Sequence, residues 1–141
     1  MLSLPKVLLL SEDAEESANL QEILGHSAFL SLSRDLSETK RNLEKDDCDV
    51  VFCAWSFYRG FWNGWLQVMR ERYPDIPVVI LSRNGGEREW LEVLEAGAFD
   101  LLAFPCQRLS VLGVVQQAMV SHEAKKLNRL AALERVERNV N

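Results

Sequence analysis

Carboxylate and hydroxyl side chains next to apolar runs are the residues of this sequence best placed to do chemistry. Glu12 and Asp13 are adjacent and follow one apolar run, and Ser82 ends another. Carboxylate oxygens can hold Mg²⁺, whereas a serine hydroxyl acts as a nucleophile only when a base activates it. The two histidines, His26 and His122, follow the first predicted helix and lie late in the last one. We therefore expect neighbouring backbone groups to satisfy the Ser82 hydroxyl, and we expect no enzyme activity.

Neither the cysteines nor the glycines predict a cofactor or metal site. Cys48, Cys53 and Cys106 are an odd number without paired spacing, which indicates reduced thiols and a cytoplasmic protein. Cys53 and Cys106 are expected at one end of a sheet, but two thiols without a close histidine make a poor zinc site. Gly85 and Gly86 are too few for a phosphate-binding loop. We predict no metal and no cofactor, and we expect the thiols to be buried.

Short apolar runs alternate with amphipathic stretches along the chain, and this pattern predicts the elements that position these residues. The apolar runs predict five strands, at residues 7–10, 28–32, 50–54, 77–82 and 101–104. The amphipathic stretches predict helices at residues 13–25, 37–45, 65–73, 87–96 and from 109 through 140. Gly25 and Gly97 are expected to close two of them, and Pro74 to stop a third. Strands alternating with helices predict an α/β protein with a parallel sheet covered on both faces.

Length, composition and charge are those of an ordinary globular domain. The chain has 141 residues, of which 48% are hydrophobic and 26% charged, and a formal net charge of −5. The apolar runs, such as residues 7–10, are far too short to span a membrane. Residues 1–6 lack the features of a signal peptide. We expect no membrane partner and no direct binding of nucleic acid.

Three segments resemble the receiver domain of two-component response regulators. They are LEAGAFDLLAFP at residues 94–105, DIPVVILS at 75–82 and DVVFC at 49–53. The resemblance covers about residues 5–121 and implies the flavodoxin-like, doubly wound fold, with five parallel strands in the order 2-1-3-4-5. We divide the chain into a receiver-like domain, residues 1–121, and a helical extension, residues 122–141. The resemblance also implies a signalling protein as partner.

The phosphorylation site of that family has no complete counterpart in this sequence. In receiver domains an acidic pair holds Mg²⁺, an aspartate accepts the phosphoryl group, and a hydroxyl, a lysine and a switch aromatic respond to it. Matched residue by residue, the acidic pair falls on Ser11 and Glu12, the phosphoacceptor on Ala54, the hydroxyl on Ser82, the lysine on Phe104 and the switch aromatic on Leu101.

These differences predict a domain that cannot be phosphorylated in the family's way. An alanine methyl offers no nucleophile for a phosphoryl donor. Phe104 replaces a cation by an apolar ring, so we expect a degenerate site that is rebuilt as core. The resemblance also implies a cis peptide bond before Pro105.

A dense aromatic segment follows the third predicted strand. It places six aromatic residues within eleven positions: Trp55, Phe57, Tyr58, Phe61, Trp62 and Trp65. Such a cluster either plugs the vacated site, forms a surface for a protein partner, or lines a pocket for a small ligand. We regard Trp55, Phe57, Tyr58, Phe61 and Trp62 as the candidates for interaction.

The end of the last predicted helix carries a short apolar seam. Val120, Ala124, Leu127 and Ala131 follow 4-3-4 spacing, after which the apolar positions shift phase. Three interpretations stay open: a solvated extension, the seam of a homodimer, or a linker toward an output domain.

Together these patterns predict an atypical receiver domain that acts as a protein–protein interaction module in signal transduction. One alternative is the N-terminal regulatory domain of a larger or truncated transcription regulator. A further alternative is a sensor that binds a small ligand in the aromatic pocket.

Overall fold

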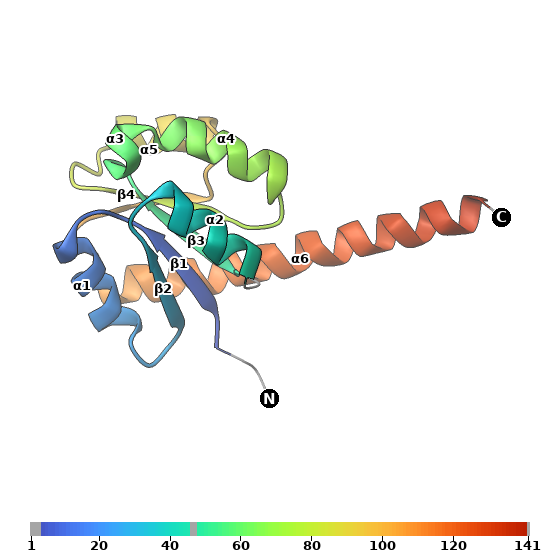
Figure 1. Cartoon of the computed structure of the whole chain (residues 1–141), viewed down its shortest axis with the longest axis horizontal. Coiled ribbons are helices and arrows are strands. Elements are labelled where there is room, and N and C mark those ends of the chain that lie inside the picture. Colours follow the sequence, from blue (N-terminus) through green and yellow to red (C-terminus); the bar gives the residue numbers. More distant parts are fainter. Residues whose placement is uncertain (1–3, 46–47, 141) are drawn as a thin grey trace.

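Five parallel strands form one sheet in the computed structural model, which describes residues 4–45 and 48–140. The strands are β1 (Lys6–Leu10), β2 (Phe29–Ser33), β3 (Val50–Ala54), β4 (Val78–Ser82) and β5 (Asp100–Ala103). Their order is β2-β1-β3-β4-β5, and every neighbouring pair is parallel (Figure 1). Because β3 and β4 are buried along their whole length, apolar residues stand at consecutive rather than alternate positions, and Ser82 at the end of β4 is the one polar residue of the two strands. The predicted fold class and strand order are confirmed.

Helices cover both faces of this sheet. They are α1 (Ala14–Leu24), α2 (Leu36–Lys45), α3 (Phe57–Gly60), α4 (Trp62–Arg72), α5 (Glu87–Glu95) and α6 (Arg108–Val140). Residues of α1 and α6, such as Leu20 and Val111, pack in one apolar cluster with one face of the sheet. Residues of α2 to α5, such as Leu66 and Val93, pack with the other face. The fold is therefore a three-layer sandwich with two cores.

Local structure departs from the sequence-based expectation at three positions. Gly25 does not close α1 in a left-handed turn, because its φ of −39° and ψ of −43° are right-handed helical values. Gly97, with φ of +101°, does end its helix in the left-handed region that favours glycine. The helix expected at residues 65–73 begins earlier, at Trp62, and the short α3 precedes it. Phe104 lies just after β5 rather than within it.

The last helix is much longer than the domain that it covers. α6 has 33 residues, or about 50 Å at about 1.5 Å per residue, and its second half projects away from the sheet (Figure 1). An ion pair of 2.9 Å between Arg129 and Asp75 holds the helix where it leaves the domain. The predicted domain division at residue 121 falls inside α6, which runs through it without a break. Residues 1–3 and 141, at the outer ends of the two predicted domains, lie outside the described residues.

Within the part of the chain that the structure describes, we find no helix with the length and apolarity needed to cross a membrane.

Candidate functional site

The carboxyl ends of three neighbouring strands bring together the residues that the sequence singled out. Ser11 directly follows β1, Ala54 ends β3 and Ser82 ends β4, and all three are buried. Loops at this edge of a parallel sheet are the usual place for ligands and chemistry. The strand order therefore gathers these positions into one site, as the resemblance implies.

A buried carboxylate occupies this site, but it is not the one that the sequence suggested. Glu12 is exposed, whereas Glu16, in the first turn of α1, is buried. The Ser11 hydroxyl donates to Glu16 Oε1 over 2.6 Å. Glu16 was not predicted from the sequence, because the family's acidic pair directly follows the first strand, whereas Glu16 lies one helical turn farther along the chain.

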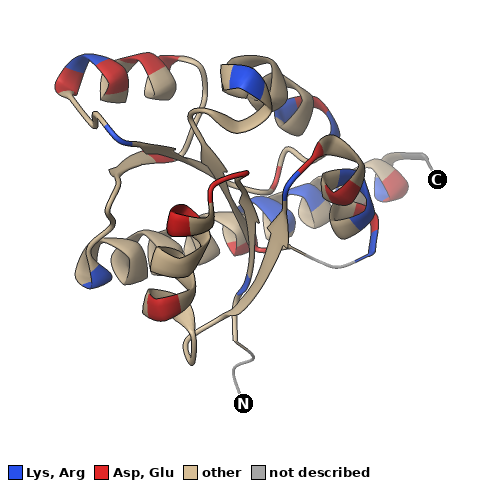
Figure 2. Ribbon diagram, turned by 60° about the vertical axis from the view of Figure 1, so that its left-hand side comes forward, with Lys and Arg blue, Asp and Glu red and all other residues tan. Residues whose placement is uncertain are grey.

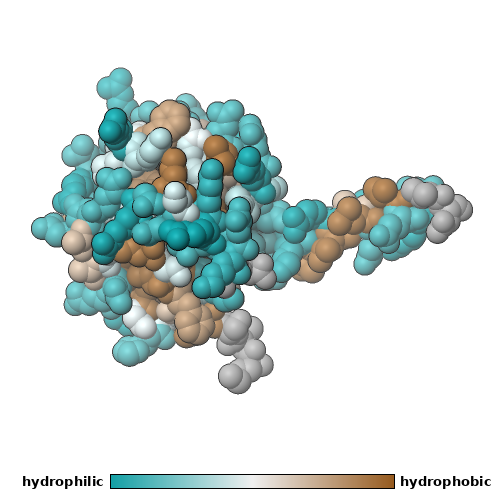
Figure 3. All heavy atoms as spheres, viewed as in Figure 1, coloured by the Kyte–Doolittle hydropathy of each residue, from teal (hydrophilic) through white to brown (hydrophobic). Residues whose placement is uncertain are grey.

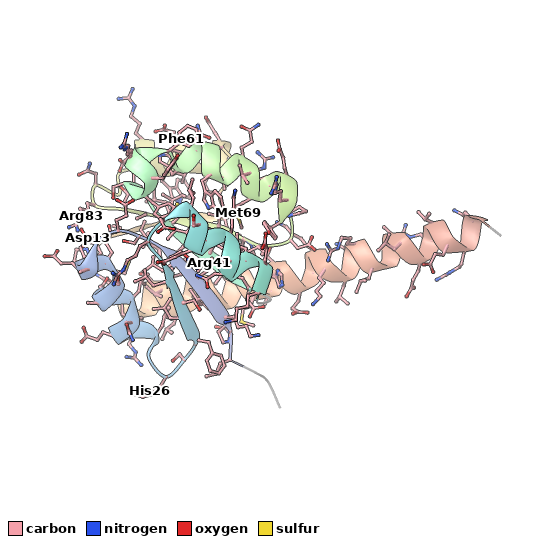
Figure 4. All side chains as sticks on the ribbon, viewed as in Figure 1. Asp13, His26, Arg41, Phe61, Met69 and Arg83 are labelled. Atoms are coloured by element: carbon pink, nitrogen blue, oxygen red, sulfur yellow. The ribbon has the colours of Figure 1, made fainter. Side chains whose placement is uncertain are left out.

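Asp13 begins α1 and is also tied to the other side of the site. Its Oδ1 accepts hydrogen bonds from the backbone N–H groups of Glu15 (2.7 Å) and Glu16 (3.3 Å), as a helix N-cap does. Its Oδ2 pairs with Arg83 Nη2 at 2.7 Å, and the two labelled side chains meet in Figure 4. The bond from Glu15 lowers the pKa of Asp13, desolvation opposes this shift, and bonds from Glu16 and Arg83 add to it.

Arg83 supplies the positive charge of this edge, a role that the sequence comparison did not assign. Its guanidinium lies 4.0 Å from Glu16 Oε2 and 3.8 Å from Glu15 Oε2, besides its short contact with Asp13. Its Cζ lies 4.5 Å from the centre of the Phe104 ring, within the range of a cation–π contact.

Phe104 is therefore not the fully buried core residue that we expected. The ring is only half-buried, and Arg83 lies over it. The expectation that the site is rebuilt as core is wrong at this position, because the charged guanidinium of Arg83, which also contacts Asp13 and Glu16, lies over the ring. The peptide bond from Phe104 to Pro105 is cis, as the resemblance implies.

Ser82 has its hydrogen-bonding capacity satisfied at the end of β4. Its hydroxyl donates to Glu89 Oε1 over 2.9 Å and accepts from the backbone N–H groups of Asn84 (3.2 Å) and Gly85 (3.3 Å). The backbone partners match the sequence-based expectation, and the carboxylate from α5 is an addition to it. A cavity of about 180 Å³ lies beside this serine, lined among others by Glu16, Glu89 and Arg83.

The remaining matched positions carry no reactive group. Ala54 is 0% exposed and Leu101 is buried in the same apolar cluster.

The thiols of Cys53 and Cys106 are not reactive groups either. Burial is the main cause that raises the pKa of the Cys106 thiol to about 11, and the charge of Glu16 adds to it; the same two causes raise the pKa of Cys53 even more. Both cysteines are buried, as expected, and neither supplies a thiolate near neutral pH.

The aromatic segment divides into buried and exposed residues. Phe57, Trp62 and Trp65 are buried in the core cluster that contains Ala54. Half-buried Trp55 packs against Trp62, with ring centres 4.9 Å apart. Phe57 and Trp62 therefore fill the core rather than face a partner, which corrects our expectation for these two candidates.

Tyr58 and Phe61 are the two aromatic residues of the segment that remain at the surface. They are 46% and 60% exposed, and their rings meet edge-on with centres 6.2 Å apart. Tyr58 and the following Arg59 have φ of 51° and 58°, a left-handed conformation that is costly for residues other than glycine. This turn holds the Tyr58 ring outside the core.

Comparison with solved structures shows that this chain has the fold of receiver domains. No family model matches the sequence, and no curated protein matches it. Among solved structures, the signal receiver domain of an HD domain-containing protein from Pseudomonas fluorescens Pf-5 is 18% identical, with a TM-score of 0.75, over 86% of this chain and 99% of that one.

Two further solved structures share this fold. The beryllofluoride-activated NtrC4 receiver domain dimer is 17% identical, with a TM-score of 0.74, over 83% of this chain and 98% of that one. NtrX from Brucella abortus, in complex with ADP, is 16% identical, with a TM-score of 0.76, over 93% of this chain but 29% of that longer one.

Replacing Arg83 by methionine tests the charge balance of the site. We expect the pKa of Asp13 to rise in Arg83→Met but to stay below its ordinary value, because the two backbone hydrogen bonds remain. A lowered folded-state pKa stabilises the fold above the ordinary pKa, and this stabilisation is lost as the pH falls through the folded-state value. As the pH falls, the Arg83→Met variant should therefore lose this stabilisation at a higher pH than the unaltered chain does.

Carbon-13 NMR titration of the Asp13 carboxyl measures this pKa directly. Arg88→Met, which removes an exposed arginine from α5, is the matched control and should leave Asp13 unchanged. An Asp13 pKa that is the same in Arg83→Met as in the unaltered chain would contradict the assigned ion pair.

Proposed function

From the receiver fold of this chain, we propose that it is a cytoplasmic signalling module that binds protein partners and does not accept a phosphoryl group. The observation that carries this proposal is Ala54. It is completely buried at the end of β3, where the resemblance places the phosphoacceptor, and it offers no oxygen or other nucleophile.

The charges around Ala54 support the same conclusion. Glu16 accepts the hydrogen bond from Ser11, and Asp13 pairs with Arg83, so both groups already have partners inside the chain. A phosphoryl group entering the neighbouring cavity would meet the carboxylates of Glu16 and Glu89. Arg83 also lines this cavity, but it already pairs with Asp13, so an added phosphoryl group would compete with that carboxylate for the guanidinium. The site therefore disfavours an added anion.

Two exposed aromatic residues offer a surface for a protein partner. Tyr58 and Phe61 border a groove of about 440 Å³ between α2 and α4, which is also lined by Leu36, Lys40 and Val68. Trp65 lines the groove from below, and its buried Nε1 has no hydrogen-bond partner. Exposed aromatic rings are enriched where proteins bind one another.

A second group of exposed apolar side chains lies on α5 and near the start of α6. Trp90 and Leu91 on α5 are 41% and 47% exposed, and Leu109 near the start of α6 is 85% exposed. We propose the α5–α6 face as an additional contact surface. Positive and negative side chains are interspersed over the helices (Figure 2), so we do not propose nucleic acid as a direct partner.

A second candidate function is regulation of an attached output domain through α6. The match to NtrX extends over 93% of this chain within a much longer protein. A long helix that leaves the domain can transmit movement to whatever follows it, and this supports the alternative of a regulatory domain in a larger transcription regulator.

Exposure to a small phosphoryl donor tests the main proposal. We expect the chain, incubated with acetyl phosphate and Mg²⁺, to keep its mass in intact-protein mass spectrometry. A receiver domain that carries the phosphoacceptor aspartate serves as the positive control under identical conditions. A phosphoryl adduct on this chain, at Ser11, Ser82 or elsewhere in the site, would refute the proposal.

Self-association along the predicted seam of α6 is a separate test. Val120, Ala124, Leu127 and Ala131 are all exposed, and apolar patches follow the projecting helix (Figure 3). We propose that two copies pair along this seam, so the full chain should sediment as a dimer. Leu127→Glu, at a residue that is 63% exposed, should shift it toward the monomer.

Leu133→Glu is the matched control, since Leu133 is 55% exposed on the same helix but lies outside the seam. This variant should remain dimeric. A monomeric unaltered chain, or equal disruption by the two substitutions, would show that the seam does not pair.

A further inference from the structure

Three side chains with metal-binding atoms converge at the amino-terminal edge of the sheet, opposite the degenerate site. Asp49 directly precedes β3, and His122 and Glu123 are neighbours on α6. One ligand atom from each of the three lies within 4.8 Å of the others. His122 Nε2 lies 3.8 Å from Asp49 Oδ1.

The His122 ring is oriented as a metal-binding imidazole usually is. It is only 9% exposed, and its Nδ1 lies 2.8 Å from the backbone oxygen of Asp75. Because a carbonyl oxygen can only accept, Nδ1 must carry the hydrogen of this bond. In the neutral ring the lone pair is then on Nε2, the atom that faces Asp49. Metal-ligating histidines are commonly held by such a bond through the other ring nitrogen.

Neighbouring groups also hold the other parts of this cluster in place. Asp49 Oδ2 accepts from the backbone N–H of Lys6 over 2.8 Å, which leaves Oδ1 on the side of His122. The carboxylate of Asp75 pairs with Arg129 at 2.9 Å, so the segment that orients His122 is itself attached to α6. The cluster is therefore supported by contacts to β1, to the loop before β4 and to α6.

We propose that Asp49, His122 and Glu123 form a binding site for a divalent transition metal ion, with zinc as the best fit. Zinc accepts one imidazole nitrogen and two carboxylate oxygens at about 2.0–2.2 Å, with water as a fourth ligand. Ligand atoms in such a site lie about 3.5 Å apart, so His122 Nε2 and Asp49 Oδ1 need to approach by only a few tenths of an ångström. A site with an imidazole ligand is a poor fit for Mg²⁺ or Ca²⁺, because these ions prefer ligand sets made entirely of oxygen.

A metal at this place would join α6 to the sheet just before the helix leaves the domain. Its ligands come from the loop before β3 and from the turn of α6 that contains His122. Binding to the folded state alone would raise thermal stability in proportion to the logarithm of the free metal concentration above the dissociation constant. The site shares no residue with the proposed contact surfaces, so it can be tested independently of them.

Zinc titration of the chelator-treated full chain tests the proposal, with isothermal calorimetry for affinity and thermal unfolding for stability. We expect one zinc ion per chain and a melting temperature that rises with zinc. His122→Gln and Asp49→Asn should each weaken binding by at least about 10–100-fold, since loss of even an outer-shell partner has that effect. Glutamine at 122 keeps a donor for the Asp75 carbonyl, and circular dichroism of each variant confirms that it is folded.

Two substitutions provide matched controls. Glu134→Gln removes an exposed carboxylate from the same helix, and His26→Gln removes the exposed histidine that follows α1, so both should bind zinc as the unaltered chain does. Long-range proton–nitrogen NMR of His122 should show zinc shifting the Nε2 resonance.

Failure of the unaltered chain to bind zinc would reduce the cluster to a contact between His122 and Asp49 and overturn the proposal. Binding that survives both His122→Gln and Asp49→Asn, or that is lost in His26→Gln, would place the metal elsewhere and overturn it equally.

Discussion

The ion pair between Arg83 and Asp13 is the contact on which the carboxyl edge of this sheet depends. Asp13 caps α1, Glu16 extends from the same turn, and the guanidinium that faces both also covers the Phe104 ring after β5. One side chain from the β4 loop thus links the first and last strands of the site. Ala54 provides no charge at the centre, and the carboxylates of Asp13 and Glu16 share the single cation of Arg83.

The same arrangement supports the proposed function, in which the usual phosphoryl chemistry plays no part. A receiver that switches needs groups that change partner when a phosphoryl group arrives. Here Ser82 is held by Glu89 and two backbone N–H groups, and Leu101 is buried where a switch aromatic would move. The two hydroxyls of the site, at Ser11 and Ser82, are each engaged by a carboxylate from a helix. Under the proposed function, such a domain would stay in one state and present fixed surfaces to its partners.

The sequence predicted β1, β3 and β4 well because their burial on both faces leaves continuous apolar runs, such as Val50–Ala54. It could not identify Arg83 and Glu16 as site residues, because their roles depend on distances that only the folded chain sets. It also gave no sign of the left-handed turn at Tyr58 and Arg59, since neither residue is a glycine. Asp49 and His122 are far apart in the sequence, and no local spacing indicates that they meet.

Binding of a phosphoryl mimic to the site tests the central claim most directly. Proton–nitrogen NMR spectra of the full chain would be recorded with Mg²⁺ alone and with Mg²⁺ plus beryllofluoride. A site whose charged and hydroxyl groups already have partners within the chain predicts that the amide resonances of Ser11, Ala54, Trp55 and Ser82 keep their positions under both conditions. Saturable shifts of these resonances on addition of beryllofluoride would contradict the account, because they would show that the site still takes up a phosphoryl-like anion.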